Sequence, residues 1–218
     1  SVYRPKPMVE INGKLHEPAF NLSGGGDSWR DSAVIRCARA GFEIVQVGTD
    51  SQQYDKGEGR PCDFTRLDEA VRRILHVEPN AYLMTSIKLG LREWAALHPD
   101  EQIGYGTGPA DPRCADDYRG RPVRASAASD AYRARAIAIL REFAAFVKSK
   151  PWAKRVVAVR VCYGIYTEWH TYGMFEAPDT GRRMQEKFRA HMLGKRGLAD
   201  VAVPSAEMRR RGGDLLDP

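Results

Sequence analysis

Short apolar segments rich in β-branched residues alternate with segments of helical period, and this alternation constrains the fold more than any other feature of the sequence. Strands are expected near residues 18–22, 42–47, 81–87 and 156–161, and helices near 27–40, 65–75, 129–147 and 182–193. This order predicts an α/β fold with a parallel sheet, completed either as a barrel or as an open doubly wound sheet. The last strand is almost continuously apolar, which predicts that it is covered on both faces.

Two of the expected helices begin with a capping signal. Thr65 and Asp68 have the spacing of a capping box, and Ser129 is expected to cap the third helix. Residues 88–128, which precede Ser129, form the longest irregular stretch and are rich in Gly, Pro and Asp. Loops of this length in compact domains are usually functional or disordered, so this stretch is a candidate for either.

The composition and the motif content argue against several function classes. The chain has 218 residues with 34 basic and 28 acidic side chains, but no basic stripe interleaved with aromatic residues, so nucleic-acid binding is not favoured. No apolar run is long enough to span a membrane, and the four cysteines lack metal-binding spacing. The glycine motifs of dinucleotide and P-loop sites are also absent from the sequence. The cellular compartment stays open.

The richest candidate segment is residues 162–173, which follow the last expected strand. In a parallel α/β protein, ligands meet the carboxyl ends of the strands. Glu168 is surrounded in the sequence by aromatic residues and a histidine, and apolar rings raise the pKa of a neighbouring carboxyl group. Glu168 is therefore a candidate general acid, and Tyr166 and Trp169 could face a sugar ring. The alternative is that Glu168 forms a structural ion pair and the aromatic residues belong to the core.

Three further residues are candidate substrate ligands, each with a structural alternative. Asp50 follows the second expected strand and could bind a sugar hydroxyl or cap the loop. Trp94 could be a sugar-stacking platform or a buried anchor of its loop. His170 could bind a hydroxyl or tune Glu168, or serve as a structural hydrogen-bonding group. Glu168 and His170 lack a third ligand, so we expect neither a metal site nor a cofactor.

Several short motifs occur together in a characteristic order along the chain. They are Asn12-Gly13-Lys14, Trp94 with His98-Pro99-Asp100-Glu101, residues 125–129, and Gly164-Ile165-Tyr166-Thr167-Glu168-Trp169. Together they resemble the β-galactosidase-like barrels of the clan-A glycoside hydrolases. The resemblance implies a (β/α)8 TIM-type barrel of which residues 1–218 are the N-terminal half, a single domain with about four βα units. It also implies that Glu168 is the acid/base. The family usually has Asn before this acid, as a ligand of the sugar 2-hydroxyl, whereas this chain has Thr167.

The resemblance predicts a retaining β-glycosidase that hydrolyses a galactoside-like carbohydrate. The nucleophile of this clan lies on the seventh strand, so we expect the chain alone to be inactive. Its expected partners are a carbohydrate substrate and the remaining half of the barrel, which could be a C-terminal segment or another chain. Whether the chain forms a homo-oligomer stays open. The alternatives are a non-catalytic carbohydrate-binding or scaffold half-barrel and a sugar-phosphate isomerase barrel.

Overall fold

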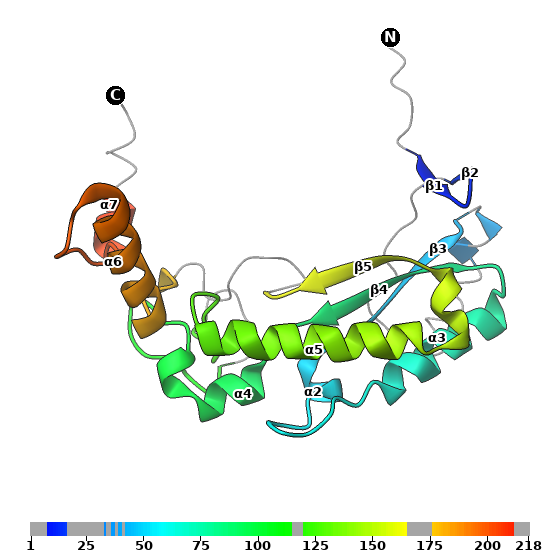
Figure 1. The fold of residues 1–218 in the computed structure, drawn as a ribbon, viewed down its shortest axis with the longest axis horizontal. Coiled ribbons are helices and arrows are strands. Elements are labelled where there is room, and N and C mark those ends of the chain that lie inside the picture. The colour runs from blue at the N-terminus through cyan, green and yellow to red at the C-terminus, as the bar shows by residue number, and fades with distance from the viewer. Residues whose placement is uncertain are drawn as a thin grey trace, which may run out of the picture. The chain divides into compact units, whose positions relative to one another are not determined.

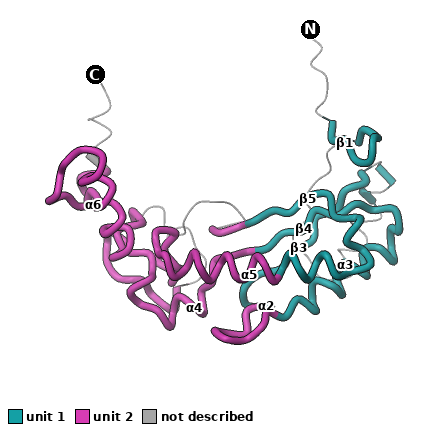
Figure 2. The backbone as a smooth tube through the Cα atoms, in the orientation of Figure 1, with its two compact units in different colours: residues 1–54, 63–87, 143–161 teal, residues 55–62, 88–142, 162–218 magenta. Residues whose placement is uncertain are grey.

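A computed structural model of the chain describes residues 8–16, 33, 36–37, 39–40, 42–114, 120–164 and 176–211. The described residues belong to two compact units (Figure 2). The first comprises residues 1–54, 63–87 and 143–161, and the second comprises residues 55–62, 88–142 and 162–218. The first expected strand lies outside the described residues, while residues 33, 36, 37 and 39 are helical, as expected. A single domain over the whole chain stays a prediction.

Three parallel strands form the sheet around which the first unit is built. They are β3 (Ile44–Thr49), β4 (Tyr82–Lys88) and β5 (Val156–Cys162), in the order β3-β4-β5. The register between β3 and β4 pairs Val45 with Leu83 and Val47 with Thr85, and β4 and β5 run in the same direction in Figure 1. The predicted parallel sheet is therefore confirmed. It does not close into a barrel within the described part of the chain.

The first unit also contains helices. They are α2 (Ser51–Tyr54), α3 (Thr65–Val77), the end of α5 (Asp130–Lys148) and the 3-10 helix η2 (Pro151–Arg155). Of these, α3 contacts β3. The apolar stripe of α3 is buried, as its period predicts. Beside α3, Phe64 makes ring contacts with Tyr54, Phe143 and Phe146 at centroid distances of 5.2 to 5.5 Å. Aromatic residues that are distant in the sequence thus join the helices into one core.

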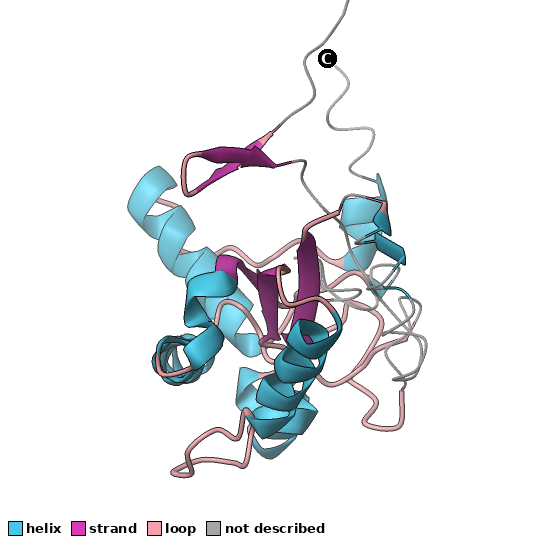
Figure 3. Cartoon of the chain, turned by 90° about the vertical axis from the view of Figure 1, so that its right-hand side faces the viewer, coloured by secondary structure: helices cyan, strands magenta, loops and turns pink. Residues whose placement is uncertain are grey.

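A short hairpin, which the sequence analysis did not predict, covers residues at the start of the strands. It consists of β1 (Val9–Ile11) and β2 (Lys14–His16), which form a separate sheet (Figure 3). Asn12 and Gly13 form its turn with positive φ angles of 53° and 78°, a conformation that favours an Asn-Gly pair. The hairpin residue Ile11 packs in one apolar cluster with Phe42, Ile44, Tyr82, Met84 and Val157.

The expectation that the last strand is covered on both faces is wrong for the described residues. Ala158 and Val159 are both exposed, and Val159 keeps 50% of its accessible surface. Neighbouring side chains of a strand point to opposite faces, so β5 is open on both faces at its centre. The described part of the chain therefore leaves apolar side chains of β5 exposed.

The expected capping box at the start of α3 is also wrong. Phe64 precedes the helix and supplies no side-chain cap, whereas Asp63 Oδ1 accepts the N–H of Thr65 at 3.0 Å. The Asp68 carboxylate instead accepts a hydrogen bond from Trp152 Nε1 at 2.7 Å and pairs with Arg72 and Lys150 at 2.9 and 3.5 Å. Burial raises the pKa of Asp68, but the Trp152 hydrogen bond and the two cations outweigh burial and lower it. Asp68 thus connects α3 to η2.

Replacing Asp68 by Ala should reduce the free energy of unfolding by about 1–3 kcal/mol, because the buried Trp152 N–H loses its acceptor. The pKa of Asp68 is lower in the folded chain than in the unfolded chain, where it is about 4. The ionised carboxylate therefore stabilises the fold above about pH 4, and this stabilisation is lost as the pH falls through the pKa of the folded chain. Urea unfolding at neutral and acidic pH measures both effects. Glu69→Ala, at an exposed position of the same helix, should change stability by less than about 0.5 kcal/mol. Equal losses in both variants would contradict the role of Asp68.

The second unit contains most of the remaining helices. They are α4 (Arg92–Leu97), the 3-10 helix η1 (Pro99–Glu101), the first part of α5, α6 (Arg182–Arg196) and α7 (Ala206–Arg211). The stretch 88–128 therefore contains two short helices and is not wholly irregular. The predicted cap of α5 is confirmed, since Ser129 Oγ accepts the N–H of Tyr132 at 2.9 Å.

Candidate functional site

The structure describes two of the residues predicted to form the site, Asp50 and Trp94. The other predicted site residues lie outside the described part of the chain, and their roles stay predictions. They are Tyr166, Thr167, Glu168, Trp169 and His170. The described residues nevertheless include both flanks of this segment, and these flanks show where it begins and ends.

Asp50 lies directly after β3 and has a carboxylate oxygen without a partner among the described residues. Its main-chain carbonyl accepts the N–H groups of Gln53 and Tyr54, so its backbone starts α2. Asp50 Oδ1 is buried and makes no hydrogen bond to any described residue. A buried acceptor without a donor costs about 1–3 kcal/mol, which a ligand hydroxyl could recover. The unpaired acceptor suits a sugar hydroxyl, and the binding of a sugar by Asp50 stays a prediction.

Trp94 is a buried residue of α4. Only 5% of its surface is exposed, and its Nε1–H donates to Glu58 Oε1 at 2.6 Å. The indole ring stacks on His98 at a centroid distance of 4.2 Å and lies 6.5 Å from the ring of Tyr132. These contacts fit the buried loop anchor better than an open platform for sugar stacking. Substrate contact by Trp94 stays untested.

Two buried tyrosines fix the N-terminal flank of the segment that contains Glu168. The N–H of Leu89 donates to the carbonyl of Cys162 at 2.6 Å. The hydroxyl of Tyr163 donates to the carbonyl of Ala125 at 2.5 Å, and that of Tyr132 donates to the carbonyl of Leu89 at 3.0 Å. Burial raises the pKa of both tyrosines, so both hydroxyls stay protonated donors. Residues 162–163 are therefore held by the stretch 88–128, which the sequence analysis did not foresee.

The carboxylate of Asp179 makes three of the contacts that hold the C-terminal flank. Its Oδ1 accepts the N–H groups of Gly104 and Gly181 at 2.9 and 2.7 Å, and its Oδ2 accepts the hydroxyl of Ser126 at 2.5 Å. Next to it, the N–H of Thr180 donates to the carbonyl of Gly104 at 2.8 Å. Both flanks of residues 165–175 are thus attached to the same stretch of the second unit.

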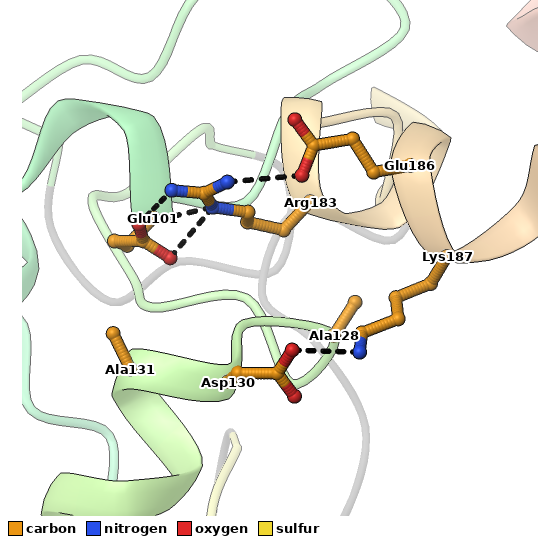
Figure 4. A pocket seen from close by; sticks show the side chains of 7 residues that line it. All are labelled: Glu101, Ala128, Asp130, Ala131, Arg183, Glu186 and Lys187. Carbon is orange, nitrogen blue, oxygen red and sulfur yellow. Dashed lines mark hydrogen bonds and ion pairs between the residues drawn. The ribbon is translucent and has the colours of Figure 1, made fainter. Parts of the chain in front are cut away.

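One pocket of the second unit is described, with a volume of about 280 Å³ (Figure 4). It is lined by Glu101, Ala128, Asp130, Ala131, Arg183, Glu186 and Lys187. Arg183 binds Glu101 through Nε at 2.9 and 3.0 Å and Glu186 through Nη1 at 2.9 Å, and Lys187 binds Asp130 at 2.7 Å. Hydrogen bonds from Arg183 lower the pKa values of Glu101 and Glu186, and Lys187 lowers that of Asp130. Carboxylates held in the charged form cannot act as general acids near neutral pH, so these ion pairs suit a structural role.

The described residues supply neither a metal cluster nor a membrane span. No group of three or more His, Cys, Asp or Glu side chains in the described ranges could hold a metal ion. Among the same residues, no helix is both long and apolar enough to cross a membrane.

Comparison with solved structures identifies the architecture. The β-galactosidase from Bacillus circulans sp. alkalophilus superimposes with a TM-score of 0.53 at 20% identity, over 80% of this chain. The chain has a β-galactosidase-like fold. The cold-adapted β-galactosidase from Rahnella sp. R3 matches with a TM-score of 0.53 at 17% identity over 78% of the chain. The β-galactosidase from the haloarchaeon Halorubrum lacusprofundi matches with a TM-score of 0.52 at 17% identity over 77% of the chain.

The likeness covers only part of these larger enzymes. The chain spans 22–23% of the length of the three β-galactosidases. No protein-family model matches the sequence, and a search of curated proteins found no relative. At this level of identity the likeness shows the fold, which agrees with the resemblance seen in the sequence.

Proposed function

We propose that the chain is part of a retaining β-glycosidase for galactoside-like substrates, with Glu168 as the general acid/base. The observation that carries this proposal is the β-galactosidase-like fold of a chain in which Glu168 comes shortly after β5. In parallel α/β barrels the reacting groups follow the carboxyl ends of the strands. The buried Tyr163 and the carboxylate of Asp179 support this assignment, because they hold the two flanks of the segment that contains Glu168.

In this mechanism Glu168 protonates the departing glycosidic oxygen and then activates the water that releases the sugar. A retaining enzyme also needs a second carboxylate about 5–5.5 Å away as the nucleophile. We assign that carboxylate to the remaining half of a (β/α)8 barrel. The proposed substrate ligands are Asp50, Trp94, Tyr166, Thr167, Trp169 and His170.

The open faces of β5 support the proposal that another half of a barrel completes this one. Ala158 and Val159 point to opposite faces of the strand and are both exposed. An exposed apolar strand at the edge of a sheet invites pairing with unwanted partners, so proteins usually cover it. The strands that would cover β5 could come from a C-terminal segment or from another chain.

We expect the isolated 218-residue chain to show no turnover of aryl β-galactosides, because the proposed nucleophile belongs to the other half of the barrel. Release of the aryl alcohol measures this, with the complete glycosidase as the positive control. Hydrolysis by the isolated chain that disappears in Glu168→Gln would show that the nucleophile lies within these residues.

The direct test of the function is substitution of Glu168 in the complete glycosidase, assayed on substrates with good and poor leaving groups. A complete protein that binds carbohydrate without hydrolysing it would instead favour the non-catalytic alternative.

A further inference from the structure

Ala177 has a backbone conformation that alanine rarely adopts. Its φ angle is +52°, in the left-handed region, where the Cβ of an L-residue lies too close to the following carbonyl oxygen. Glycine has no Cβ and therefore no such penalty. Ala177 follows residues 165–175 and comes shortly before Asp179 and α6. Other contacts must therefore hold this turn of the chain in its left-handed conformation.

Arg209 of α7 supplies two contacts to this turn. Its Nη2 donates to the carbonyl of Ala177 at 2.5 Å, and its Nη1 donates to the carbonyl of Pro178 at 3.0 Å. Its Nε is buried without a partner among the described residues, so the two carbonyl contacts must offset the cost of removing this N–H from water. A guanidinium presents its donors in a rigid fork, which suits two successive carbonyls.

The chain that leads to α7 is attached to α6 by contacts that do not involve Arg209. The N–H of Val203 donates to Gln185 Oε1 at 2.9 Å, and Arg189 Nε donates to the carbonyl of Val201 at 3.1 Å. The chain therefore runs back along α6 before α7 begins (Figure 1). These contacts give α7 an anchor of its own.

The turn at Ala177 leads into Asp179, whose carboxylate accepts three hydrogen bonds. Two of the donors belong to residues 104–126. Glu176, just before the turn, is bound to the same stretch through its carbonyl. The residues on either side of the turn are thus attached to one stretch of the second unit, whereas the carbonyls of the turn itself are bound by Arg209.

We propose that Arg209 is a positioning residue, which holds the left-handed turn at Ala177 and so keeps Asp179 in place after the segment that contains Glu168. The effect of Arg209 on catalysis rests on the proposed function, because Arg209 would act on Glu168 only through this segment. Its hold on the turn is independent of that function. The helix α7 thereby has a task beyond ending the described part of the chain.

Amide hydrogen exchange in the 218-residue chain tests this hold on the turn. The reporters are the N–H groups of Thr180 and Gly181, which are hydrogen-bonded just after the turn. Arg209→Met keeps the length of the side chain but removes both hydrogen bonds from a charged donor. The exchange of both reporters should therefore rise about ten- to a hundredfold, while that of α5 stays unchanged.

A second variant and a matched control accompany this measurement. Arg209→Lys keeps the charge but replaces the fork by a single ammonium group, so it should give a smaller rise than Arg209→Met. Arg196→Met, at an exposed arginine of α6, should leave the exchange of both reporters unchanged. Equal exchange in Arg209→Met and in the unsubstituted chain would overturn the proposal.

A substitution at Ala177 tests whether Arg209 acts through the left-handed turn. Ala177→Gly removes the conformational penalty, so its addition to Arg209→Met should lower the exchange of Thr180 and Gly181 again by about fivefold. If Ala177→Gly restores no protection in this background, Arg209 does not hold the turn in its left-handed conformation.

Kinetics of the proposed complete glycosidase test the step from the turn to catalysis. Arg209→Lys should lower kcat by up to about a hundredfold and leave KM nearly unchanged, because it misplaces the acid without removing a substrate ligand. An unchanged kcat, despite faster exchange of the reporters, would overturn the positioning role. A complete protein without glycosidase activity would contradict the proposed function, whereas the exchange experiment decides the hold of Arg209 on the turn by itself.

Discussion

In the proposed complete glycosidase, Glu168→Ala should reduce the hydrolysis of alkyl and sugar aglycones by about a hundred- to ten-thousandfold, the usual contribution of a general acid. Activated aryl glycosides should lose much less, because their leaving groups depart without protonation. Added azide should restore part of the rate on activated substrates by entering the space left by the carboxylate. Measurement of kcat and kcat/KM over a series of leaving groups checks this result.

A matched acid gives the control for this prediction. Glu176 also follows β5, but its carboxylate is hydrogen-bonded to the hydroxyl of Thr107, and its main-chain carbonyl accepts the N–H of Gly106. Glu176→Ala should affect all leaving groups alike and should not respond to azide. If Glu168→Ala lowers the rates of both substrate classes equally, without azide rescue, Glu168 has a binding or structural role.

The strands and long helices could be predicted from the sequence because their signals are local. Apolar runs of β-branched residues placed β3, β4 and β5 to within two residues, and Ser129 marked the start of α5. Asn12-Gly13 is an equally local signal for a hairpin turn, and it could have revealed β1 and β2. A local sequence signal is sufficient to predict a helix, strand or turn that depends only on the backbone preferences of its own residues.

The features that were missed depend on contacts between distant residues. Asp68 has the spacing of a capping residue, but its carboxylate binds Trp152, which is 84 positions away in the sequence. The buried Trp152 N–H needs an acceptor, and this requirement outweighs the local capping preference. Glu58 and Asp179 were missed for the same reason, since their partners are 36 to 75 positions away. A carboxylate carries no sequence signal for which of several donors it will meet.

Gly104 and Gly181 mark a close crossing of two backbone segments that also could not be read from the sequence. A Cβ added at Gly104 would lie 2.5 Å from the Cα of Gly181 and would overlap its backbone nitrogen. A Cβ added at Gly181 would lie 2.5 Å from the carbonyl oxygen of Gln102 and 2.7 Å from the nitrogen of Gly104. These neighbours are backbone atoms, which cannot turn away as a flexible side chain can. The crossing therefore requires glycine on both segments.

Gly104→Ala should consequently destabilise the chain by about 3 kcal/mol or more, at the upper end of the usual cost of overpacking. The same change at Gly194, in α6, has open space around it and should increase stability by about 0.5–1 kcal/mol because alanine favours the helix. Chemical unfolding of both variants measures the loss of stability expected for Gly104→Ala and the gain expected for Gly194→Ala. Because Asp179 binds the N–H groups of both Gly104 and Gly181, separating the segments also breaks its hydrogen bonds at the C-terminal flank of the Glu168 segment. In the proposed complete glycosidase, Gly104→Ala should therefore lose activity while Gly194→Ala keeps it. Equal stability of the two variants would contradict the close crossing.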